Sequence, residues 1–244
     1  MGSIKKYSFV NGSTDYGTIA KKLVEGIASC CGFTIVQVGA DTTSTYEAYL
    51  SAFDNTDCLV KIWNSSSSYY AQPYFYDQNG EYTVAGRTYC APVSKTTINV
   101  PRYASDSNVI IGVQTDSVRM CVLNSDNNSV FGFAKTKDIF TGEEFYIVTI
   151  YPYSLYCGFG NGSVLEFASA NYTSTRAAHP YVRAYPMEYG SETKQNVVNT
   201  LGLEFYQIQH GDGWLASGVG SVVSINGHKY ICMNKSYGAY IRFN

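Results

Sequence analysis

The clearest pattern of apolar and polar positions lies near the N-terminus and predicts a helix over about 15–31. Apolar residues recur there three and four positions apart, which places them on one helix face, and charged residues fall between them. The predicted buried face comprises Ile19, Ala20, Leu23, Val24, Ile27, Ala28 and Cys31. Asp15 is suited to cap the first turn through its side chain, and Gly32 is suited to end the helix. A strand over 33–38 follows, and we expect the helix to pack on the sheet that this strand joins.

Most of the following pattern consists of short apolar or alternating runs, which predict β-strands. The expected strands cover 58–63, 69–76, 81–93 with a break at Gly86, 108–114, 119–123, 130–134, 145–151 and 164–168. Turn residues over 125–128 separate two of them, and the strands from 108 to 151 are expected to form an antiparallel meander. Pro73 has no backbone N–H to donate, so the strand over 69–76 is expected at a sheet edge.

The C-terminal pattern predicts a β-hairpin. Runs over 222–225 and 228–233 flank Asn226-Gly227, a dipeptide that two-residue hairpin turns favour. One more strand is expected over 238–243.

The region before this hairpin is less regular. The segment over 177–190 holds two prolines and is predicted to run as an extended loop. Ser191 is placed to cap a short helix that runs to Leu201. If the chain divides into two units, 155–190 is where we expect the division.

Together these elements predict one mainly β domain over 1–244, with an N-terminal helix, antiparallel sheets and a sandwich-like body. This is a β-rich α+β fold. Apolar residues make up 45% of the chain and charged residues only 15%, a composition that excludes an intrinsically disordered protein.

Charge and hydropathy argue against two classes of partner. The net charge is −2, and Lys5-Lys6 and Lys21-Lys22 are the only adjacent basic pairs, whereas nucleic-acid binders cluster their positive charge. No apolar run is long enough to span a membrane, and residues 1–10 lack the apolar run of a signal peptide. We therefore expect no nucleic-acid partner, no membrane insertion and synthesis in the cytoplasm.

The cysteines fit that compartment. There are seven, the count is odd, and no C-x-x-C pair occurs. Free thiols made in a reducing cytoplasm are the expected state. They are Cys30, Cys31, Cys58, Cys90, Cys121, Cys157 and Cys232.

No motif predicts a metal or a cofactor. The three histidines occur in no zinc-binding spacing, and His210-Gly211-Asp212, the nearest to a metal site, is better interpreted as a polar loop. The glycine-rich run over 158–162 lacks the Lys-Ser/Thr of a phosphate-binding loop. We predict no metal-binding and no cofactor-binding residue.

Catalytic chemistry is equally weak in the sequence. The serine-hydrolase motif G-x-S-x-G is absent. Two pairs of carboxylates, Glu143-Glu144 and Asp54 with Asp57, lie close in sequence, but both are interpreted as solvated turns. We predict no catalytic residue and no enzyme.

An aromatic cluster is the best candidate for binding. The chain holds 23 tyrosines, and tyrosine offers a wide contact area with one polar tip. The cluster comprises Tyr69, Tyr70, Tyr74, Phe75 and Tyr76. It could anchor a protein interface or stack on sugars. The alternative, a strand with one face in the core, is the interpretation we favour because strands are rich in aromatic residues.

Three segments resemble virion structural proteins of tailed bacteriophages. They are the helix with its following GFTIVQV; the central NVIIGVQTDSVRMCVLNSDNNSVFGFAKT with EEFYIVTIYPY; and the terminal GDGWLASGVGSVVSINGHKYICMNKSYGAYIRFN. The likeness lies in the order and style of these segments, since no diagnostic motif is present. It implies a tail, baseplate or neck component that assembles as a homo-oligomeric ring or sleeve with other virion proteins. It transfers no catalytic residue.

The leading expectation is therefore a structural or assembly protein of a phage particle, made in the bacterial host cytoplasm and located in the virion. A carbohydrate- or receptor-binding module of the particle is the alternative, and a glycan or wall hydrolase is the least favoured. An assembly subunit should bury extensive surface between copies. A lectin should show exposed aromatic residues beside Asp or Asn, and a hydrolase should show opposed carboxylates.

Overall fold

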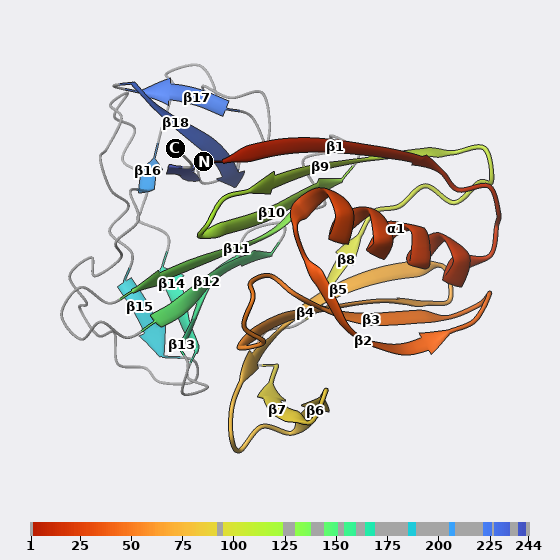
Figure 1. Ribbon diagram of the computed structural model, residues 1–244, viewed down its shortest axis with the longest axis horizontal. Coiled ribbons are helices and arrows are strands. Elements are labelled where there is room, and N and C mark those ends of the chain that lie inside the picture. The colour runs from red at the N-terminus through yellow and green to blue at the C-terminus, as the bar shows by residue number, and fades with distance from the viewer. Residues whose placement is uncertain are drawn as a thin grey trace.

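In the computed structural model, helix α1 (Tyr16–Cys31) lies between two antiparallel sheets (Figure 1). The structure describes residues 2–91, 95–123, 130–137, 144–150, 154–159, 164–168, 185–188, 205–207, 222–225, 227–234 and 239–242. The β-rich α+β class with one helix near the N-terminus is confirmed.

The first sheet has eight strands in the order β1-β9-β10-β11-β12-β13-β14-β15. Each neighbouring pair is antiparallel, so the predicted meander is confirmed and continues beyond its expected end. The strands are β1 (Ser3–Val10), β9 (Ser107–Gln114), β10 (Val118–Leu123), β11 (Val130–Lys137), β12 (Glu144–Ile150), β13 (Ser154–Phe159), β14 (Val164–Ala168) and β15 (Tyr185–Glu188). The presence of β15 corrects the extended loop expected over 177–190.

The second sheet has seven strands, with the path β2-β3-β4-β5-β7-β6 and with β8 also paired to β5. All of its pairs are antiparallel. The strands are β2 (Thr34–Asp41), β3 (Tyr46–Ser51), β4 (Cys58–Ser65), β5 (Ser68–Tyr76), β6 (Tyr82–Val84), β7 (Arg87–Cys90) and β8 (Thr96–Ile98).

Strand β5 lies inside this sheet, so the edge position expected from Pro73 is wrong. One side of β5 pairs with β4 over residues 68–75. The other side pairs with β8 at residues 69–71 and with β7 at residues 75–76. Pro73 falls in the gap between these two pairings, where the missing N–H of proline breaks no ladder hydrogen bond to β7 or β8.

A third, four-stranded sheet has the order β16-β19-β18-β17. Its strands are β16 (Phe205–Gln207), β17 (Val222–Ile225), β18 (His228–Asn234) and β19 (Ala239–Arg242). The predicted hairpin is confirmed, because Ile225 pairs with His228 and Gly227 adopts a positive φ of 81°. The helix predicted over 191–201 lies outside the described residues.

The helix pattern is confirmed, with two corrections. Leu23 and Ile27 are buried, and Gly32 ends the helix in the left-handed conformation. Asp15 occupies the N-cap position, but its side chain makes no capping hydrogen bond; its backbone oxygen accepts from Ile19 N at 3.1 Å. The helix also packs on both sheets, whereas only the sheet containing β2 was expected.

Small residues bring α1 close to the first sheet. A Cβ on Gly112 of β9 would lie 2.3 Å from the backbone oxygen of Cys30, so no side chain fits there. A Cβ on Gly26 would lie 2.7 Å from side-chain atoms of Ile110 and Tyr7. The main core is built around this contact and the opposite contact of α1 with the second sheet.

A second, smaller core covers part of the outer face, which is the face of the seven-stranded sheet that points away from α1. Tyr49, Leu59 and Tyr74 of β3, β4 and β5 pack there against Val84 and Tyr89 of β6 and β7. The short β6–β7 hairpin turns through Ala85 and Gly86, both with positive φ, at the Gly86 break seen in the sequence.

Two further features concern the described part of the chain. Five cysteines have side chains that the structure describes, and these are free, as predicted; they are Cys30, Cys31, Cys58, Cys90 and Cys121. Among the residues that the structure describes, no helix combines the length and apolar character needed to cross a bilayer.

Candidate functional site

The outer face carries an aromatic pair beside the second core. Trp63 of β4 and Tyr70 of β5 are direct cross-strand partners, and their ring centroids lie 5.4 Å apart at an angle of 31°. Because side chains alternate between the faces of a strand, the pairing fixes both rings on the same side of the sheet. Both residues are half-buried, so part of each remains accessible to solvent.

Two lysines lie over this pair. Lys95 Nζ lies 4.1 Å from the centroid of Tyr70 and 6.0 Å from that of Trp63. Lys61 Nζ lies 5.0 Å from the centroid of Trp63 and 5.3 Å from that of Tyr49. Cations at these distances are attracted to the ring faces, by about 0.5–1 kcal/mol at exposed sites. The lysines therefore help to hold the two rings in place.

Lys61 is also held by a carboxylate. Its Nζ lies 2.8 Å from Glu47 on β3, and the two side chains are 18% and 27% exposed. Glu47 pairs with Trp63 across the β3–β4 ladder, so acid, base and ring occupy adjacent positions. We call Glu47, Lys61, Trp63, Tyr70 and Lys95 the Trp63 patch.

The neighbouring tyrosines extend the aromatic row into the second core. Tyr49 and Tyr74 meet edge to face at 5.6 Å, and Tyr74 meets Tyr82 at 5.1 Å. Burial raises the pKa of Tyr49 and of Tyr74 to about 12, so both hydroxyls are neutral at physiological pH. Tyr49 and Tyr74 are buried and offer little open surface, whereas Tyr82 is 42% exposed.

The structure divides the predicted aromatic cluster between the two faces of β5. Tyr69 and Phe75 point into the main core, and Tyr70, Tyr74 and Tyr76 lie on the outer face, as the period of two requires. Tyr69, Tyr74 and Phe75 are buried, whereas Tyr70 and Tyr76 keep partial exposure. A binding role for these residues stays a prediction, and on the outer face it rests on Tyr70 and Tyr76.

Sequence reasoning missed Trp63, Lys61, Glu47 and Lys95. The only signal available was the alternation along 58–65, where Leu59, Lys61 and Trp63 share a face. Their approach to Tyr70 depends on the β4–β5 register, which the sequence alone does not reveal.

The other candidates from the sequence fall elsewhere. Asp57 forms an ion pair with Arg87 at 2.8 Å, and Asp54 is exposed in the loop before β4. Glu144 begins β12, whereas Glu143 lies outside the described residues. The run His210-Gly211-Asp212 and the end of the glycine-rich run over 158–162 also lie outside them. Where side chains are described, no group of three or more His, Cys, Asp or Glu is placed to hold a metal ion.

No family model matches the chain, and neither a curated protein nor a solved structure is significantly similar to it.

Proposed function

We propose that the chain is a structural protein of a tailed-phage particle and that it acts by protein–protein contact through the Trp63 patch. The observation that carries the proposal is the Trp63–Tyr70 pair, fixed by cross-strand register and by two lysines. Tryptophan and tyrosine are enriched among the residues that dominate binding energy at interfaces. A ring pair already held in place loses little conformational entropy when a partner binds.

The composition of the whole chain supports a contact role. Tyrosine is abundant, with 23 residues, and charged residues make up only 15%. Interfaces are skewed in the same direction, towards aromatic residues and away from Lys and Glu. Partners in this proposal are other virion proteins and further copies of the chain in a ring or sleeve; the phage setting itself comes from the sequence resemblance.

The test replaces the ring pair in the phage that encodes the chain. Trp63→Ala/Tyr70→Ala should prevent incorporation of the chain into particles, or weaken its binding to its virion partner by about thirtyfold, the equivalent of a 2 kcal/mol hot spot. Tyr103→Ala is the matched control, because Tyr103 is 74% exposed and lies off the patch. Absence of the parent chain from purified particles, or normal incorporation of a folded double variant, would refute the proposal.

A carbohydrate-binding role is the second candidate, and one observation favours it. The Trp63 and Tyr70 rings are tilted by only 31°, and polar Gln72 and Thr97 lie on the same sheet face, beside Tyr70 along β5 and across the β5–β8 pairing. Such a surface suits the stacking of a sugar ring with hydrogen bonds at its rim. Saturable binding of host-surface polysaccharide by the isolated chain, lost in the double variant, would favour this role over assembly.

A further inference from the structure

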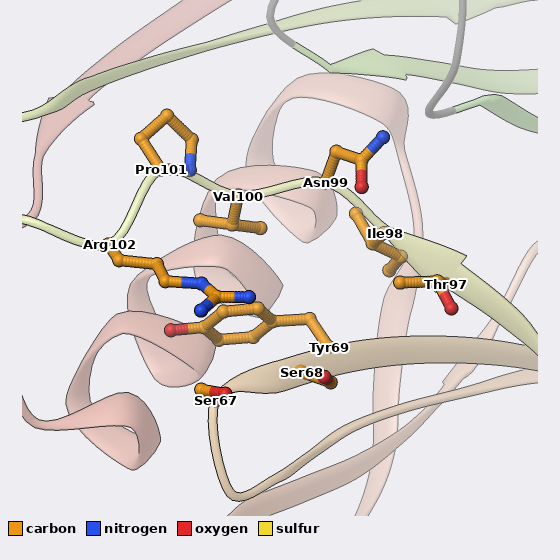
Figure 2. Close-up of a pocket in the computed structure, with 9 residues that line it drawn as sticks. All are labelled: Ser67, Ser68, Tyr69, Thr97, Ile98, Asn99, Val100, Pro101 and Arg102. Carbon is orange, nitrogen blue, oxygen red and sulfur yellow. The ribbon is translucent and has the colours of Figure 1, made fainter.

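A cavity opens at the start of β5, next to the Trp63 patch but lined by none of its residues. It is lined by the β4–β5 turn, by β8 and by the segment 99–102 that leads towards β9 (Figure 2). Its volume is about 320 Å³. Small-molecule sites begin at about this size, roughly 300 Å³.

A buried phenol lies in the wall of this cavity. Tyr69 is 1% exposed, and its hydroxyl has no hydrogen-bond partner; among the described residues it is the only buried side-chain N or O atom in that state. Burial raises its pKa to about 12, so the group is a neutral O–H donor at physiological pH. Leaving such a donor unsatisfied costs about 1–3 kcal/mol, which makes it unusual in a folded protein.

A free cation lies beside the phenol. Arg102 extends over the Tyr69 ring in Figure 2, and its charge acts on the hydroxyl by lowering the pKa that burial raises. The side chain of Arg102 is exposed, and the three ion pairs found within the described residues do not include it. Arg102 and Tyr69 thus line one space, together with the hydroxyl-bearing residues Ser67 and Ser68 that directly precede Tyr69.

The wall that carries Arg102 is fixed in place. The buried Asn11 side chain donates through Nδ2 to the backbone oxygens of Pro101 and Tyr103, each at 2.9 Å. Asn11 N and Gly12 N donate to Asp106 and Ala104, which ties the rest of the loop to the chain before α1. The backbone that carries Arg102 is therefore held in position before any ligand arrives, and this lowers the entropic cost of binding.

We propose that this cavity binds a small-molecule carboxylate, with the Tyr69 hydroxyl and the Arg102 guanidinium donating to its oxygens. The guanidinium carries a positive charge and can only donate, and the neutral phenol can donate beside it, so an anionic acceptor is the ligand group that complements both. The planar fork of arginine matches a carboxylate, and its hydrogen bonds to charged oxygens are the stronger kind. The cavity leaves room for a ligand body of monosaccharide size beside Ser67 and Ser68.

Titration with chosen probes tests the proposal on the full chain. Acetate, benzoate and glucuronate are the carboxylate probes, glucose is the uncharged match of glucuronate, and inorganic phosphate is the other anion. NMR or calorimetry at up to about 10 mM, tenfold above a millimolar Kd, should give saturable binding of at least one carboxylate. No saturation with any carboxylate, equal binding of glucose, or stronger binding of phosphate would overturn it.

Two variants locate the bound group. Tyr69→Phe and Arg102→Gln should each weaken the carboxylate by tenfold or more, whereas Tyr103→Phe, next in sequence and outside the cavity lining, should bind like the parent. Tyr69→Phe should melt at the parent temperature or above, because it removes a hydroxyl that has no partner. A clearly lower melting temperature, or unchanged affinity in both variants, would refute the assignment. Trp63→Ala/Tyr70→Ala should leave carboxylate binding intact, so this test is independent of the assembly proposal.

Discussion

Replacing Asn11 by alanine should destabilise the protein through one buried amide. Asn11 donates to the backbone oxygens of Pro101 and Tyr103, each at 2.9 Å, and accepts from Asn108 Nδ2 at 2.7 Å. Two of these hydrogen bonds join the segment before α1 to the loop that precedes β9, and the third joins it to β9 itself. Both asparagines are fully buried, so water does not readily replace the bond between them.

The size of the effect follows from these bonds. Each hydrogen bond contributes about 1 kcal/mol net, and a buried group left without its partner loses more. We expect Asn11→Ala to lower the free energy of unfolding by roughly 2–4 kcal/mol. For a chain of this length that corresponds to a fall in Tm of roughly 4–16 °C. The variant should still fold, because domains are typically stable by about 5–15 kcal/mol.

Urea unfolding followed by tryptophan fluorescence measures the change, with the m-value expected to stay constant. Asn79→Ala is the control, since Asn79 is exposed at a turn and its backbone N–H, which donates to Asp77, survives the substitution. The control should lie within about 0.5 kcal/mol of the parent. An Asn11→Ala protein that unfolds at the parent midpoint would show that the loop is held by other contacts.

Three further predictions concern the cores. Leu23→Asp places a carboxylate at a fully buried helix position and should lower the free energy of unfolding by about 3–5 kcal/mol. A soluble variant that melts within a degree or two of the parent would contradict the packing of α1. Gly112→Ala should push α1 off β9 and lower the urea midpoint, because the new Cβ would lie 2.3 Å from the backbone oxygen of Cys30. Gly86→Ala is the control for backbone strain alone, because a Cβ at Gly86 meets nothing within 4 Å. Burial raises the pKa of Tyr49 and Tyr74 to about 12, above the usual value of about 10. Because these tyrosines lose their protons at lower pH in the unfolded chain, the stability of the protein should fall as pH rises from about 10 to 12. Tyrosinate absorbance that titrates entirely near pH 10 in the folded protein would contradict this.

Much of the fold follows from local patterns. Helix α1 was predictable because its apolar face repeats with helical spacing, and the strands of the meander were predictable because turn residues separate short apolar runs. Strand β1 was missed because only Phe9 of its residues is buried, so its polar composition conceals its role. Strand β3 was missed for the opposite reason: with both faces covered, its alternation disappears.

The candidate sites depended on contacts that no local pattern contains. The edge position inferred from Pro73 failed because β7 and β8 approach β5 from later in the chain and leave a gap at that residue. Trp63 and Tyr70 meet only through the β4–β5 register. The cavity at Tyr69 is lined in part by Arg102, and the loop that carries Arg102 is positioned by Asn11, which is far from it in the sequence.

The pairing of β1 with β9 has a consequence for biosynthesis. Val10 pairs with Ser107 and Ser3 with Gln114, so β1 can pair with β9 only after all strands of the seven-stranded sheet have been synthesised. Until then, the face of α1 that packs on Ile110 and Gly112 has no cover. Long-range pairings of this kind slow folding and leave apolar surface open to aggregation. A nascent chain that stops before residue 107 therefore leaves this face of α1 uncovered, and β9 is the strand that gives β1 its partner; β10, β11 and β12 then add further residues to the same core.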